Sequence, residues 1–73
     1  MFGIVKQVVH VEGMHCGHCA MNVEAALRRV EGVKAAKADF EKKLCVIKAK
    51  PAITEDQAKK AIESIGFTFV GLE

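Results

Sequence analysis

Two cysteines, Cys16 and Cys19, lie three positions apart in a chain of 73 residues. Two thiols at this spacing can converge on one small ion, and soft thiolates select ions such as Cu(I) and Zn(II) over Mg²⁺ and Ca²⁺. Gly13 and Gly17 lie on either side of Cys16 and let the backbone bend close to an ion without a Cβ in the way. The pair therefore predicts a site for a soft or borderline metal ion, such as Cu(I) or Zn(II), with Cys16 and Cys19 as its ligands.

The residues around this pair predict where each thiol lies. The stretch from Ile4 to Val11 is rich in Val and Ile, which is typical of a strand, and Gly13 then opens a loop that holds Cys16. From about His18 to Glu31 apolar residues recur at steps of three and four, which predicts an amphipathic helix that stops at Gly32. Its apolar side carries Ala20, Val23, Leu27 and Val30, and its solvated side carries Glu24, Arg28 and Arg29. Cys19 falls in the opening turn, where the partial positive charge of a helix N-terminus favours thiolate over thiol.

The rest of the chain predicts two strands, a second helix and a last strand. The two strands are residues 33–40 and 44–49, with Ala36, Ala38 and Phe40 on one face together with the core residues Cys45 and Ile47. Thr54 and Gln57 have the spacing of a capping box, and the helix that they open closes at Gly66. Residues 67–72 form the last strand. This order predicts an α+β fold, a ferredoxin-like βαββαβ sandwich in which a four-stranded antiparallel sheet carries two helices on one face.

Composition narrows the classes of function. A chain of this length predicts a single domain, residues 1–73. Because Trp and Tyr are absent, a shaped pocket for an organic substrate is hard to build, and we expect no enzymatic activity. A net charge of +2 without a basic run argues against nucleic acid as a partner, and no apolar stretch is long enough to insert into a membrane. An odd number of cysteines, three, argues against a secreted disulfide scaffold and favours the cytoplasm.

The sequence resembles the heavy-metal-associated domain family, which includes copper chaperones, N-terminal domains of metal-pumping P-type ATPases and mercuric-ion-binding proteins. The resemblance covers about Val5 to Leu72 and rests on three motifs: Gly13-Met14-x-Cys16-x-x-Cys19, Val30-Glu31-Gly32-Val33 and Ile62-x-x-Ile65-Gly66-Phe67. It implies a metallochaperone-like protein that holds one ion on Cys16 and Cys19. The ion would pass to a metal-transporting P-type ATPase or to another domain of this family. The carrier is expected to be a monomer, or a dimer bridged by the metal.

The resemblance also implies roles for three neighbours of the cysteines. Met14 would pack beneath the loop and not bind the metal, and Phe67 would lie beside the loop from the far end of the chain. His15 stands where pump domains of the family can carry an additional ligand, so it is a candidate third ligand, above all for Zn(II). The helical position of His18 directs its side chain away from the ion, and His10 is expected on a face of the sheet.

Two alternatives to a Cu(I) carrier remain open. One keeps the family and changes the ion to Hg(II) or Zn(II), in a detoxification system or a pump. The other is a glutaredoxin-like thiol oxidoreductase, since Cys-Gly-His-Cys is the tetrapeptide of disulfide isomerases. That fold requires a further strand and helix after Gly32, and a proline that leads into a strand. Pro51 instead leads into a predicted helix.

Overall fold

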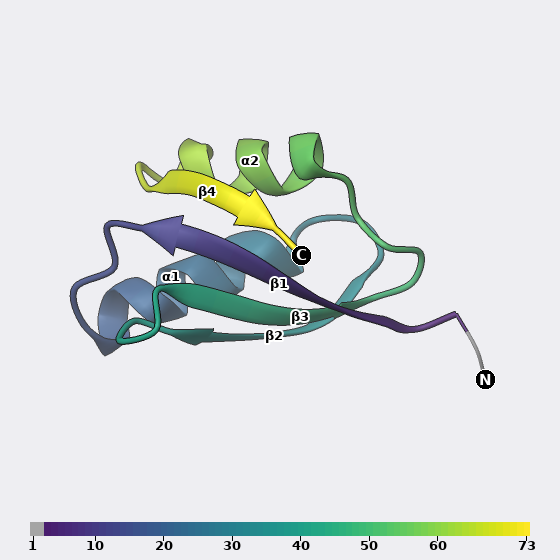
Figure 1. Cartoon of the computed structure of the whole chain (residues 1–73), viewed down its shortest axis with the longest axis horizontal. Coiled ribbons are helices and arrows are strands. Elements are labelled where there is room, and N and C mark those ends of the chain that lie inside the picture. Colours follow the sequence, from purple (N-terminus) through teal and green to yellow (C-terminus); the bar gives the residue numbers. More distant parts are fainter. Residues whose placement is uncertain (1–2) are drawn as a thin grey trace.

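The computed structural model describes residues 3–73, and its elements occur in the predicted order. They are β1 (Val5–Glu12), α1 (Gly17–Arg28), β2 (Val33–Asp39), β3 (Leu44–Ala49), α2 (Glu55–Ser64) and β4 (Thr68–Leu72). The strands form one antiparallel sheet in the order β2-β3-β1-β4, and both helices lie on the same side of it (Figure 1). The predicted ferredoxin-like α+β sandwich is confirmed. No helix within residues 3–73 has the length and apolar character needed to cross a membrane.

The core lies between the sheet and the helices, because alternate residues of each inner strand point to that side. On β1 these are Val9 and Val11, and on β3 they are Cys45, Ile47 and Ala49, all fully buried. The helices contribute residues at the spacing predicted for an amphipathic helix: Ala20, Val23 and Leu27 from α1, with Ala58 and Ile62 from α2. One hydrophobic cluster therefore joins β1, β3 and both helices.

The predicted start and end of the second helix are confirmed, whereas the predicted end of the first helix is wrong. At the start of α2, Gln57 N donates to Thr54 Oγ1 (3.1 Å) and Thr54 N donates to Gln57 Oε1 (2.8 Å), so the capping box is confirmed. Gly66 follows the C-cap of α2 with φ +89°, as a helix-stopping glycine does. The first helix ends earlier than predicted, at Arg28 and not near Glu31.

The central strands place their residues largely as predicted, with one exception. Ala36 lies opposite Ile47, and Ala38 lies opposite Cys45. Phe40 was predicted to share this face, but it lies in the turn after β2 and is 37% exposed. The strand ends at Asp39 because its carboxylate accepts hydrogen bonds from the backbone N–H groups of Glu41 and Lys42, which closes a turn.

One polar contact anchors α1 to the sheet. The carboxylate of Glu24 accepts a hydrogen bond from Ala38 N at 2.8 Å. The sequence predicted that Glu24 lies on the solvated side of the helix, and this is wrong: the residue is half-buried between α1 and the edge strand β2. The carboxylate satisfies an N–H that an edge strand would otherwise leave unpaired.

A second polar contact lies at the end of the sheet that is opposite to the cysteine loop. The amide of Gln7, the one buried polar residue of the described chain, donates to Ile53 O and accepts from Ile53 N, each at 3.0 Å. This pair of hydrogen bonds fixes the segment between β3 and α2. The loop between β1 and α1 lies at the other end of the sheet (Figure 1).

Candidate metal centre

Both candidate ligands lie where β1 passes into α1. Cys16 is the N-cap of α1, with an extended backbone (φ −160°, ψ 177°), and its carbonyl accepts from Ala20 N at 3.1 Å. Cys19 is the third residue of the helix and is half-buried, whereas Cys16 is exposed. The first thiol is therefore at the end of the loop and the second in the opening turn of the helix, as predicted.

The helix N-terminus lowers the pKa of the Cys16 thiol. The largest cause is the backbone N–H of Cys19, followed by that of His18, and the Cys19 thiol makes a smaller contribution in the same direction. These N–H groups belong to the first turn of α1, where no intrahelical acceptor is available. The neutral thiol makes no capping hydrogen bond, so the stabilisation applies to the thiolate. The first turn also lacks an acidic residue that would oppose it.

The third cysteine has the opposite environment. Cys45 lies on β3 and is fully buried. Burial, with a smaller contribution from the Glu24 carboxylate, raises its pKa to about 12. A neutral, buried thiol behaves as a small apolar side chain. The prediction that Cys45 is a core residue is confirmed.

The loop rests on two side chains that the family resemblance singled out. Met14 is buried within the hydrophobic core, with Cys19 and Phe67 packed against the same cluster. Phe67, which follows α2, lies against the loop backbone: a Cβ built on Gly13 would be 2.8 Å from Phe67 Cδ1. Both residues therefore support the loop from below, as the resemblance implied.

The histidines do not join the two cysteines in one cluster. His15 and His18 are exposed, and within residues 3–73 no three His, Cys, Asp or Glu side chains are grouped so that they could share a metal ion. The third-ligand role of His15 stays a prediction. His10 lies on β1, as expected, with Nε2 at 3.4 Å from Glu73 Oε2. The geometry of the His10–Glu73 pair does not meet the requirements of a hydrogen bond. His10 Nε2 is therefore buried without a hydrogen-bond partner in the described part of the chain.

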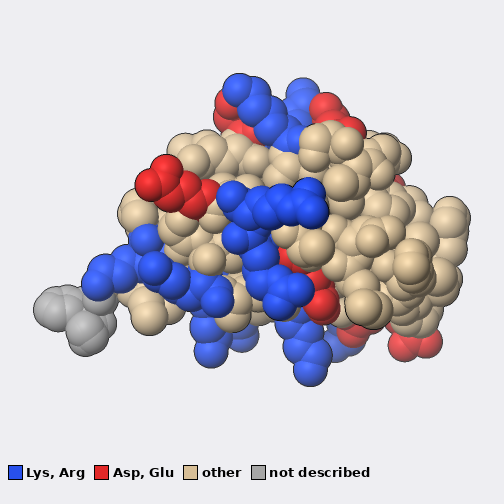
Figure 2. Space-filling model, turned by 180° about the vertical axis from the view of Figure 1, so that it is seen from behind, with Lys and Arg blue, Asp and Glu red and all other residues tan. Residues whose placement is uncertain are grey.

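The cysteine loop and the start of α1 carry no charged side chain, since no Asp, Glu, Lys or Arg occurs from Gly13 to Val23. The corresponding end of the molecule, on the right in Figure 2, shows acidic side chains at its lower edge and no Lys or Arg on that side. Met21, on α1, is 65% exposed there. Sequence reasoning missed Met21 as a surface residue beside the site. The available signal was its position outside the apolar series Ala20, Val23, Leu27.

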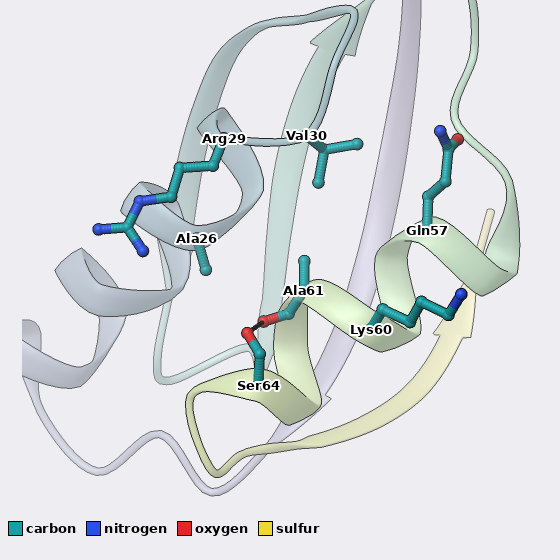
Figure 3. A pocket seen from close by; sticks show the side chains of 7 residues that line it. All are labelled: Ala26, Arg29, Val30, Gln57, Lys60, Ala61 and Ser64. Carbon is teal, nitrogen blue, oxygen red and sulfur yellow. Dashed lines mark hydrogen bonds between the residues drawn. The ribbon is translucent and has the colours of Figure 1, made fainter.

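A shallow groove between α1 and α2 offers no alternative metal site. Its volume is about 340 Å³, and Figure 3 shows the side chains that line it: Ala26, Arg29, Val30, Gln57, Lys60, Ala61 and Ser64. The Ser64 hydroxyl donates to Ala61 O, and the charged ends of Arg29 and Lys60 extend away from each other. The groove contains no thiol or imidazole, so it lacks the ligands that a soft ion requires.

Comparison with known proteins gives consistent matches over most of the chain. The family described as heavy-metal-associated domain matches residues 8–68. Copper chaperone CopZ of Staphylococcus haemolyticus (strain JCSC1435) is 37% identical over 65 residues, which cover 88% of this chain and 96% of the relative. The solved structure of a CopZ metallochaperone has a TM-score of 0.79 at 35% identity, covering 90% of this chain and 100% of that chain. A copper binding domain from HMA7, a P-type ATPase, has a TM-score of 0.79 at 34% identity, covering 93% and 96%.

Proposed function

The chain belongs to the heavy-metal-associated domain family, and on this premise we propose that it binds one Cu(I) ion on Cys16 and Cys19 and transfers it to a partner domain. The observation that carries the proposal is the placement of two free thiols at a helix N-terminus, one exposed and one half-buried. Thiolates are the ligands that Cu(I) prefers. The lowered pKa of Cys16 increases the fraction of its thiolate, the form that binds a metal ion.

Transfer follows from the small number of ligands. Two sulfurs leave Cu(I) with room for a third, so a thiolate of the partner can bind before either Cys16 or Cys19 leaves, as in thiol–disulfide exchange. Because Cys16 is exposed, the incoming thiolate reaches the ion from solvent. The loop itself carries no Asp, Glu, Lys or Arg, so another thiol-bearing surface can contact it without burying an unpaired ion of the loop.

The partner that fits best is a domain of the same family, either in a metal-transporting P-type ATPase or in a second copy bridged by the metal. Support for the first comes from the similarity of this chain to a domain of HMA7, a P-type ATPase. Transfer requires reduced thiols, so the proposed compartment is the cytoplasm. The activity is stoichiometric binding and release, without turnover.

The alternatives change the ion or the chemistry. Zn(II) prefers four ligands and would need His15 or partner groups in addition to the two thiols. Hg(II) is a soft ion that the same sulfurs would accept. The glutaredoxin-like alternative receives no support from the fold, because residues 3–73 contain two helices on one side of a ferredoxin-like sheet.

Anaerobic competition titration of the reduced protein with Cu(I), Zn(II) and Hg(II) tests the proposal. We expect one Cu(I) per chain, lost in the double variant Cys16→Ser/Cys19→Ser and retained in Cys45→Ala. The variant Cys45→Ala is the matched control because it removes a thiol that lies in the core. Full Cu(I) affinity in the double variant would exclude the two thiols as ligands. Catalytic reduction of a disulfide substrate by the parent protein would instead favour the oxidoreductase.

A further inference from the structure

The side of the sheet away from the helices carries a hollow of about 530 Å³. Four lysines line it, Lys6, Lys37, Lys42 and Lys48, together with one carboxylate, that of Asp39. All four lysines are exposed, whereas Leu44 and Val46, which also line the hollow, are half-buried. The hollow thus has an apolar floor and a basic rim. No residue of the cysteine loop lines it.

Two of these lysines oppose each other. Lys6 on β1 is the direct cross-strand partner of Lys48 on β3. Like charges in directly opposite positions destabilise a sheet. Within residues 3–73 the lysines that form ion pairs are Lys43, with Glu12, and Lys60, with Asp56. Lys6 and Lys48 therefore repel each other without a compensating carboxylate from the described chain.

The one acid at the rim is already occupied. Asp39 Oδ1 accepts hydrogen bonds from Glu41 N (3.0 Å) and Lys42 N (3.1 Å). The helices, by contrast, have mixed charges: α2 carries Glu55, Asp56 and Glu63 beside Lys59 and Lys60. Positive and negative side chains are interspersed on the back of the molecule (Figure 2). Four lysines against one carboxylate leave the rim of the hollow with an excess of positive charge.

We propose that this hollow binds an acidic segment of a partner protein. Carboxylates of the segment would lie between Lys6 and Lys48 and relieve their repulsion, and an apolar side chain would cover Leu44 and Val46. A concave surface with an apolar floor fits a protruding segment better than a flat lipid bilayer. Nucleic acid fits poorly, because no aromatic ring lines the hollow for a base to stack on.

This contact goes beyond metal transfer and does not depend on it. The cysteine loop lies at one end of the sheet (Figure 1), so it stays accessible while the sheet face is covered. A partner could hold the carrier through the sheet and still leave the thiols free. Loss of metal binding in the cysteine variant would leave this proposal unaffected.

The test is a titration of the full reduced chain with an N-acetylated peptide amide of sequence Glu-Glu-Leu-Glu-Glu-Leu-Glu-Glu. Binding is measured by NMR, from the shifts of the protein's backbone amide signals. We expect saturable binding that shifts the amides of β1, β2 and β3 near the hollow. Lys6→Gln/Lys48→Gln should weaken binding about tenfold, and the matched control Lys59→Gln/Lys60→Gln, with the same change of net charge, by less than about twofold. The same peptide with Gln in place of Glu should not bind.

Three outcomes would overturn the proposal. The first is non-saturable binding, or an equal loss in the two double variants, which would indicate attraction to net charge alone. The second is a shift centred on residues 14–19, which would place the contact at the cysteine loop. The third is tighter binding to vesicles of phosphatidylcholine and phosphatidylserine than to the peptide, lost in Lys6→Gln/Lys48→Gln, which would assign the hollow to a membrane surface.

Discussion

The ring of Phe67 lies so close to Gly13 that a Cβ on Gly13 would be 2.8 Å from Phe67 Cδ1. Gly13 also has φ +111°, a backbone conformation that L side chains rarely adopt. Both effects predict that Gly13→Ala lowers the free energy of unfolding, by about 1–3 kcal/mol. Urea denaturation of the metal-free, reduced protein measures this loss.

Gly17→Ala is the matched control, four residues further along the same loop and helix start. A Cβ on Gly17 meets no atom within 4 Å, and its φ is not positive. We expect this variant to stay within about 0.5 kcal/mol of the parent or to be more stable. An equal loss in both variants would show that the loop tolerates no Cβ anywhere, independently of Phe67.

The raised pKa of Cys45 predicts a loss of stability in alkali. Below about pH 9, the ordinary pKa of a cysteine thiol, Cys45 is protonated in both the folded and the unfolded chain. Between there and its folded pKa of about 12 only the unfolded chain ionises. The free energy of unfolding should therefore fall with rising pH, by up to about 1.4 kcal/mol per pH unit.

Other groups also change charge in alkali, so the effect of Cys45 is measured as the difference between two proteins. The variant Cys45→Ala should be less stable at neutral pH, because it leaves a small cavity. Its stability should then decline less steeply above about pH 9 than that of the parent. Parallel pH profiles for the two proteins would contradict the burial of this thiol.

The hydrogen bond from Ala38 N to Glu24 Oε2 predicts a cost for losing the acceptor. Glu24→Ala should lower the free energy of unfolding by about 1–3 kcal/mol, because the N–H of a half-buried edge strand is left unpaired. Glu24→Gln keeps an acceptor and should lose less. Amide hydrogen exchange at Ala38 reports the bond directly, and Glu31→Ala, at an exposed position, controls for the loss of charge.

His15 is expected to tune the choice of ion without being needed for Cu(I). Two thiolates suffice for Cu(I), whereas Zn(II) prefers a fuller shell of nitrogen and sulfur. In His15→Thr we expect Cu(I) affinity to change by less than about tenfold, or 1.4 kcal/mol, and Zn(II) affinity to fall more. Competition titrations of the variant and the parent at neutral pH measure both ions. Unchanged binding of both would make His15 an ordinary loop residue.

The opposed lysines predict a stabilising substitution. Lys48→Glu would place a carboxylate directly across from Lys6 and should raise the free energy of unfolding by about 0.2–1 kcal/mol. The gain should shrink at high salt, since both side chains are exposed. A loss of stability that is independent of salt would mean that the two ammonium groups are kept apart by their conformations.

The sequence predicted the order of the elements because their signals are local. Thr54 and Gln57 make a cap within one turn, and Gly66 ends α2 by its own backbone conformation. The Val- and Ile-rich stretch from Ile4 to Val11 likewise predicted β1, which the structure has at Val5–Glu12. The thiol pair was also a local signal, which is why its position at the helix N-terminus could be stated in advance.

Contacts between distant segments could not be predicted in this way. Periodicity indicates which face a residue occupies, but not which residue lies opposite it, so the pairing of Lys6 with Lys48 had no local signal. The register shift between His10 and Val11, where β1 meets β4, is equally invisible in the sequence. Glu24 was assigned to solvent because its partner Ala38 belongs to another element.

The strand order bears on whether the cysteine motif can keep its structure outside this chain. β1 is hydrogen-bonded on one side to β3 and on the other to β4, both of which come from the second half of the chain. A peptide of residues 5–28 would contain both thiols, yet neither strand that holds β1 in place and no Phe67 beneath the loop. Transferring the motif to another protein would move the two ligands without the strands and the ring that hold them in position. The second half of the sequence is therefore needed to hold the proposed metal ligands in position.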